Sequence, residues 1–178
     1  MIAKTIRTCF PIAAAAVSDK AEEINKLNVF PVPDGDTGTN MSLTTKELSA
    51  LPADADMEAI AGAITHGSLM GARGNSGVIT SQILRGVAEG LVSADEPITS
   101  ANIAFAFRRA VKVAFQAVRK PIEGTILTVS RLTADAARDL AAEDHGIESV
   151  LAAAIPVAKA ALDNTVNQNP VLKKAGVV

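Results

Sequence analysis

The chain has 178 residues, of which 48 % are hydrophobic and only 3 % aromatic, and its formal net charge is −2 at pH 7. This length suits a single domain, and the absence of a basic, aromatic-rich composition argues against a nucleic-acid-binding protein. The single cysteine excludes an intrachain disulfide and a cysteine-based zinc site, no apolar run reaches the roughly 18 residues of a membrane span, and we expect a cytoplasmic protein.

The apolar residues are mostly alanine, isoleucine, leucine and valine, and they recur at helical spacing rather than in alternation. Ile79, Ile83, Val87 and Leu91, for example, follow one another at intervals of four residues and define one face of a helix. We therefore expect one all-α domain over residues 1–178, an antiparallel bundle of amphipathic helices. The expected helices cover residues 2–27, 40–48, 54–70 (capped by Asp54 or Asp56), 79–91, 103–118, 126–140 and 151–162.

The first break between helices, residues 28–40, reads NVFPVPDGDTGTN. Asp34 and Asp36 lie one residue apart, and the loop contains no lysine or arginine to neutralise them. Two carboxylates held close together repel, and a hard divalent cation relieves that repulsion. Mg²⁺ commonly takes one or two carboxylates together with waters and substrate phosphates. The loop predicts a metal site for a polyphosphate, although a solvated Asp/Gly turn is an equally good interpretation of this segment alone.

Three other sites with paired aspartates or glycine loops do not fit. An EF-hand needs ligands where this loop has Gly38 and Thr45. A haloacid-dehalogenase-type phosphatase places its aspartates after a buried strand, which Pro31 and Pro33 interrupt. A Walker loop needs a lysine after its glycines, and none is present in this loop.

The second break, residues 71–77, reads GARGNSG and precedes a strongly periodic helix. Small residues allow backbone N–H groups to approach an anion, and a helix N-terminus favours negative charge. Ser76 and Arg73 are candidate phosphate ligands. A plain glycine hinge is the better interpretation of this loop taken alone, and the preceding metal-type loop shifts the balance toward one combined Mg²⁺–polyphosphate site.

The third break, residues 120–126, reads KPIEGTI, and Thr125 is either a simple helix cap or a residue that faces a ligand. His66 and His145 have no partner at metal-ligand spacing, so we expect structural or solvated roles for both.

Four segments resemble the nucleotide-binding domain of the dihydroxyacetone kinase family, and most closely its fatty acid kinase branch. They are NVFPVPDGDTGTNM at residues 28–41, GSLMGARGNSGVITSQILRG at 67–86, KPIEGTILTV at 120–129 and NPVLKKAGVV at 169–178. The resemblance implies a barrel of antiparallel helices with ATP and Mg²⁺ at one end. The family usually continues with a further helix, so we expect a fragment of a longer chain that lacks its last helix.

By position in these segments, the resemblance implies that Asp34 and Asp36 bind Mg²⁺. Asn28 lies where related kinases have a further aspartate, and it is a candidate third metal ligand. Asp34, Asp36 and Arg73 are the candidate catalytic residues. The candidate nucleotide-binding residues are Thr39, Asn40, Gly74, Asn75, Ser76, Gly77 and Thr125.

The implied reaction is transfer of the ATP γ-phosphoryl group to a fatty acid carboxylate, which a separate DegV-type fatty-acid-binding protein presents, to give an acyl phosphate. Two alternatives stay open: a kinase of a small hydroxyketone such as dihydroxyacetone, and a non-catalytic nucleotide-binding interaction module. We expect neither nucleic acid nor a membrane span, and a homodimer is compatible with the sequence.

Overall fold

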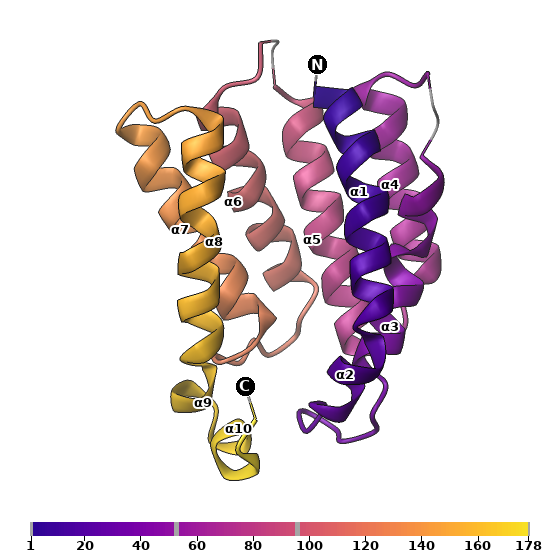
Figure 1. Cartoon of the computed structure of the whole chain (residues 1–178), viewed down its shortest axis with the longest axis vertical. Helices are drawn as coiled ribbons and strands as arrows, with labels where there is room; N and C mark the ends of the chain where they lie inside the picture. Colours follow the sequence, from indigo (N-terminus) through magenta and orange to yellow (C-terminus); the bar gives the residue numbers. More distant parts are fainter. Residues whose placement is uncertain (1, 52–53, 95–96, 178) are drawn as a thin grey trace.

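The computed structural model describes residues 2–51, 54–94 and 97–177, and within these ranges the chain forms helices and no strands (Figure 1). The α-helices are α1 (Ile2–Asp19), α2 (Ala21–Lys26), α3 (Thr37–Thr45), α4 (Met57–Gly71), α5 (Gly74–Val92), α6 (Ser100–Gln116), α7 (Ile126–Ala142), α8 (Ile147–Asp163), α9 (Thr165–Gln168) and α10 (Pro170–Ala175), and a 3₁₀ helix, η1 (Lys46–Ala50), follows α3. The expected antiparallel all-α bundle is therefore confirmed.

The long helices alternate in direction, so the three sequence breaks lie at the same end of the bundle, which is the lower end in Figure 1. These breaks are the connections before α3, between α4 and α5, and between α6 and α7. Short α9 and α10 lie at this end as well (Figure 1). The topology thus gathers the segments that the sequence singled out.

Small residues allow the central helices to approach closely. A side chain added at Gly86 or Gly90 of α5 would come within 3.0 Å of the α6 backbone or side chains at Ala110 and Ala106. Ile60 and Ile64 of α4 are among the most buried side chains of the core that α4 shares with α1 and α5. An alanine-rich composition with few aromatic residues is what such close helix packing requires.

The helices form a row over the described residues. α1 packs against α2, α3, α4 and η1, whereas α8, at the other end of the row, packs against α6, α7 and α9. The main packing partners of α1 and α8 are thus different helices, although Ile147 of α8 packs against the core cluster that includes Ile6 of α1. None of the described helices combines the length and the apolarity that crossing a membrane requires.

Three expected boundaries were wrong. The first helix does not run unbroken from 2 to 27, because the chain leaves α1 at Lys20 and starts α2. The second begins at Thr37 rather than residue 40, and the supposed glycine break at 71–77 is mostly helix, since α5 begins at Gly74. The glycines of this segment predict a break, but at Gly74 and Gly77 glycine permits close packing of α5 on α3.

Candidate functional site

The first part of the site is the N-terminus of α3, which two asparagines hold in place. The Asn28 side-chain oxygen accepts hydrogen bonds from the backbone N–H groups of Asp36 (3.1 Å) and Thr37 (3.3 Å). The Asn25 oxygen accepts from the next two N–H groups, those of Gly38 (2.7 Å) and Thr39 (3.1 Å). The N–H groups that a helix usually leaves without partners are therefore satisfied by side chains of the preceding segment.

These contacts leave the two aspartate side chains unused. Asp36 is the N-cap residue of α3, yet its carboxylate makes no capping hydrogen bond. Among the described residues, neither Asp34 nor Asp36 has a side-chain hydrogen bond or ion pair, and Asp34 is exposed while Asp36 is half-buried. Two carboxylates without protein partners, on a loop fixed by its backbone, are a donor set that suits a hard divalent cation.

The number of protein ligands for such a cation is small. Within residues 2–51, 54–94 and 97–177, no group of three or more His, Cys, Asp or Glu side chains is placed to hold a metal ion. The Asn28 side-chain oxygen accepts two backbone hydrogen bonds, so in this structure it positions the loop, and a role as metal ligand stays a prediction. A cation at Asp34 and Asp36 would complete its shell with waters and substrate oxygens, as Mg²⁺ commonly does.

The second part of the site, the turn into α5, touches α3 directly. Gly74 has a positive φ of 60°, and a side chain there would approach the Asn40 amide nitrogen to 2.5 Å. One turn further, a side chain at Gly77 would lie 2.7 Å from the Thr44 hydroxyl. Through Asn40, which is buried, the structure brings α3 and the loop of Asp34 and Asp36 before it next to the turn at residues 74–77.

The N-terminus of α5 is open, in contrast to that of α3. The N–H of Gly77 bonds to the Arg73 carbonyl, but those of Gly74, Asn75 and Ser76 have no partner among the described residues. The Arg73 side chain does not cap the helix either. Three free N–H groups at the start of a 19-residue helix form a site that favours an anion such as phosphate.

Arg73 lies beside this open turn. Its guanidinium donates hydrogen bonds to the carbonyl oxygens of Met70 (3.0 Å) and Ala72 (2.8 Å), at the end of α4. It is exposed and has no ion pair with a carboxylate among the described residues. Its positive charge is consequently available to an anionic ligand or partner.

The third break lies at the same end of the bundle but makes separate contacts. Thr125 is the N-cap of α7: its hydroxyl donates to the Ile122 carbonyl (2.9 Å) and accepts from the Leu127 N–H (3.4 Å). Gly124, with a φ of 73°, lies against Thr165 and Asn169 near the C-terminus. These contacts give Thr125 a capping role, and its predicted contact with nucleotide stays a prediction.

Glu123, next to this turn, is held as a carboxylate. The Thr128 hydroxyl and the Arg131 guanidinium both donate to it. The Thr128 hydrogen bond is the main cause that lowers the pKa of Glu123, Arg131 adds to it, and partial burial opposes both.

Sequence reasoning missed Asn25, which makes more contacts to the start of α3 than any predicted residue. Besides its two backbone bonds, its amide donates to the Thr39 hydroxyl at 3.0 Å. A signal was present, since Asn25 precedes Asn28 by three residues and both can act as caps. The capping role of Asn25 was not inferred from this signal, because the apolar pattern predicted an unbroken helix through residue 27.

Comparisons with known proteins were consistent with the resemblance. A sequence model described as "DAK2 domain" matches residues 31–178. The chain is 43 % identical over 169 residues to protein YloV of Bacillus subtilis, and 44 % and 42 % identical over 168 residues to uncharacterised proteins of Staphylococcus saprophyticus and Staphylococcus aureus (strain USA300). Each match covers 93 % of this chain but 30 % of the relative, so the chain spans less than a third of the length of these proteins.

Proposed function

Because the chain belongs to the DAK2 domain family, the dihydroxyacetone kinase family, we propose that it binds ATP with Mg²⁺ between the starts of α3 and α5 and phosphorylates a fatty acid carboxylate. A separate DegV-type fatty-acid-binding protein would present that acid. The observation that supports the proposal most is the contact of Gly74 with Asn40, because it places the start of α5 beside α3. Among the described residues, the carboxylates of Asp34 and Asp36 and the N–H groups of residues 74–76 have no partners.

The two helix starts have different tasks in this proposal. Asp34 and Asp36 hold Mg²⁺, and the N–H groups of residues 74–76 bind phosphate oxygens of the nucleotide. Bound Mg²⁺ supplies a positive charge that offsets the negative charge on the phosphate oxygens. Arg73, the residue directly before these N–H groups in the chain, is exposed and supplies a second positive charge in the proposal.

The chemistry needs positioning more than proton transfer. A fatty acid carboxylate is ionised at neutral pH, because the ordinary pKa of a carboxyl group lies near 4. One of its oxygens attacks the γ-phosphorus, the bond from that phosphorus to the β–γ bridging oxygen breaks, and ADP leaves with the electron pair. No general base is required, so catalysis rests on alignment and charge stabilisation.

Ligand binding to this chain is the first test. Thermal unfolding is measured with ATP alone, with Mg²⁺ alone and with both, because a ligand that binds only the folded state raises its stability. We expect a shift with both together that exceeds the sum of the two separate shifts. Equal shifts with and without Mg²⁺ would contradict the assignment of Asp34 and Asp36.

The acceptor is tested separately, in a relative that includes the remaining two thirds of the length. Acyl phosphate is trapped with hydroxylamine after incubation with ATP, Mg²⁺ and an oleate-loaded DegV-type protein. Phosphorylation of dihydroxyacetone instead would identify the hydroxyketone alternative. Tight nucleotide binding with neither product would indicate the non-catalytic module.

A further inference from the structure

Two surface hollows flank α4 and adjoin one another. One, of about 290 Å³, lies between α4 and the α3–η1 segment, and the other, of about 700 Å³, lies between α4, α5 and α6. His66 lines both, so the two hollows form one continuous surface across α4. We call this the α4 surface.

The α4 surface exposes several large apolar side chains. Leu69 and Phe105 line the larger hollow and are 55 % and 54 % exposed, and Met70 lines the smaller one and is 62 % exposed. Leu43 and Val92 add to the two hollows and are also exposed. Exposed large apolar side chains that gather in one place mark sites of protein–protein contact.

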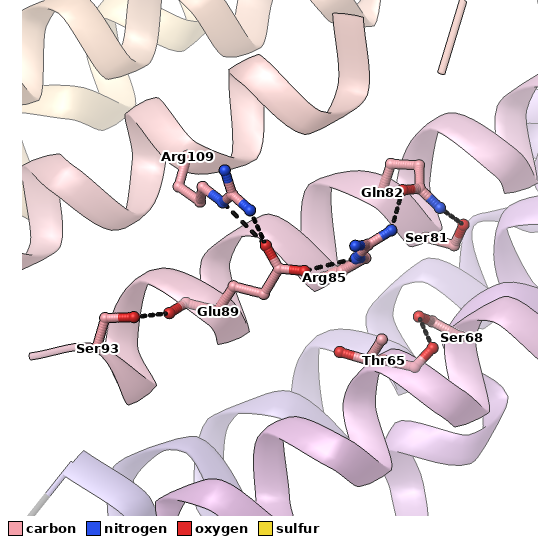
Figure 2. A network of polar contacts seen from close by, with 8 residues as sticks. All are labelled: Thr65, Ser68, Ser81, Gln82, Arg85, Glu89, Ser93 and Arg109. Atoms are coloured by element: carbon pink, nitrogen blue, oxygen red, sulfur yellow. Dashed lines mark hydrogen bonds and ion pairs between the residues drawn. The ribbon is translucent and has the colours of Figure 1, made fainter. Parts of the chain in front are cut away.

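The polar network of the larger hollow is already paired. Glu89 of α5 receives hydrogen bonds from Arg85 and from Arg109 of α6, each at 2.6 Å (Figure 2). Burial opposes ionisation of Glu89, but the two arginines outweigh it and lower its pKa. One further carboxylate, Glu58, lines this hollow. The larger hollow is therefore close to electrically neutral, and apolar contact dominates it.

The smaller hollow is cationic. Lys46 and Arg73 line it, and neither has an ion pair within the part of the chain that the structure describes. Glu47 is the only carboxylate among its described lining residues, and the stem of that side chain packs against Gly67 of α4. This end is thus positive by about one charge on a chain whose net charge is −2.

We propose that the α4 surface docks a protein whose contact face is apolar over the larger hollow and acidic where it meets Lys46 and Arg73. Arg73 directly precedes the free N–H groups of α5, so a partner seated here lies next to the proposed phosphate site. The choice of the acyl carrier as that partner, and therefore as the probe in the binding test below, rests on the proposed function.

A protein fits this surface better than a lipid bilayer. Stable attraction to an anionic membrane uses clusters of four to eight basic residues, and this surface has a small excess charge. Its apolar residues line two shallow hollows rather than a protruding face, and a folded partner can follow such a contour. A flat membrane interface would instead need a protruding apolar face.

Gly62 provides a clean test, because it lines the larger hollow and a side chain added there meets nothing within 4 Å. Gly62→Gln fills part of the hollow and should leave the unfolding temperature unchanged or raise it, since glycine disfavours helix. Binding of a purified, oleate-loaded DegV-type protein is measured by calorimetry. We expect at least tenfold weaker binding for Gly62→Gln and unchanged binding for Ala152→Gln, which places the same side chain on an exposed position of α8.

Charge reversal tests the cationic end. We expect Lys46→Glu to weaken binding several-fold, in a way that salt reduces, and Lys159→Glu on α8 to have no effect. Equal affinity of wild type and Gly62→Gln, or no binding by wild type, would overturn the docking proposal. Binding to phosphatidylglycerol vesicles that Gly62→Gln abolishes would overturn it in favour of a lipid.

These outcomes are separable from those of the proposed function. The combined ATP–Mg²⁺ stabilisation depends on the starts of α3 and α5, which Gly62 does not contact. If the nucleotide shift is absent but docking responds to Gly62→Gln, the surface stands and the kinase proposal fails. If the ATP–Mg²⁺ shift is present but the partner protein does not dock, the docking proposal fails and the nucleotide site of the kinase proposal stands.

Discussion

The starts of α3 and α5 lie side by side but differ in whether their first backbone N–H groups have hydrogen-bond partners. Each helix begins with N–H groups that need partners. At α3, Asn25 and Asn28 provide those partners for residues 36–39. At α5, the corresponding groups of residues 74–76 have none among the described residues.

In the proposed function, this difference gives the two helix starts ligands of opposite charge. An aspartate at an N-cap normally accepts a hydrogen bond from its own helix, but at α3 two asparagines do this instead and leave the Asp36 carboxylate free for a cation. At α5 no side chain of the described residues caps the helix, which is why we propose an anion there. The proposed metal–phosphate ligand needs both kinds of partner, and the Gly74–Asn40 contact shows that α3 and the start of α5 are adjacent.

The largest effect should come from Asp36→Ala, and Asp56 offers a matched control. Both residues are N-caps, but Asp56 accepts a hydrogen bond from Ala59 at 2.9 Å and Asp36 accepts none from its helix. We expect Asp36→Ala to lower kcat/KM about a thousandfold, or about 4 kcal/mol, with little change in unfolding temperature. Asp56→Ala should lower stability by about 1 kcal/mol and leave kcat/KM nearly unchanged.

Kinetics in a longer relative and thermal unfolding of this chain measure the two effects. If Asp36→Ala lowered stability as much as Asp56→Ala does, Asp36 would be a structural cap and the contrast between the two helix starts would fail.

The second largest effect should come from Gly74→Ala, with Gly176→Ala as its control. Both glycines have a positive φ, 60° and 70°, which costs another residue roughly 1–2 kcal/mol. Only Gly74 has a neighbour in the way, the Asn40 amide, whereas a side chain at Gly176 meets nothing within 4 Å. We expect Gly74→Ala to destabilise the protein more than Gly176→Ala and to weaken ATP–Mg²⁺ binding, which Gly176→Ala should leave intact.

Denaturant unfolding and nucleotide titration separate the two contributions. Equal destabilisation by the two substitutions, with unchanged nucleotide affinity for both, would show that the contact between the α5 turn and α3 is unimportant.

Sequence reasoning predicted the helical class and several boundaries, because these depend on local periodicity. Asp56, one of the two expected caps, is the N-cap of α4, and helices were expected around residues 79–91 and 126–140, where the structure has them. Neither the break at Lys20 nor the helical state of residues 74–77 is visible locally, because both depend on how α3 packs against its neighbours. The contact of the two loops also needs the tertiary structure, since Asn40 and Gly74 are far apart in sequence.

Sequence reasoning was limited in the same way at the candidate site, where it identified residues but not their contacts. Asp34, Asp36 and the GARGNSG turn stood out by composition and spacing. The sequence did not show which N–H groups have side-chain partners at the start of α3 and lack them at the start of α5. That depends on contacts in the folded chain. The α4 surface was missed entirely, since helix spacing alone does not show which apolar residues remain exposed.

The smallest effect should come from Asn25→Ala, which takes the side-chain acceptor away from N–H groups at the start of α3. The substitution removes the acceptor of the Gly38 and Thr39 N–H groups and the donor to the Thr39 hydroxyl. Loss of such a cap costs about 1–2 kcal/mol, and water can partly replace it because this segment is half-exposed. We expect lower stability with a smaller loss of kcat/KM than Asp36→Ala causes.

Asn25→Asp retains the acceptor but places a third carboxylate near Asp36, so added Mg²⁺ should stabilise this variant more than wild type. If Mg²⁺ stabilised Asn25→Asp and wild type equally, the cation would not lie at the start of α3, because a carboxylate introduced there would otherwise be felt.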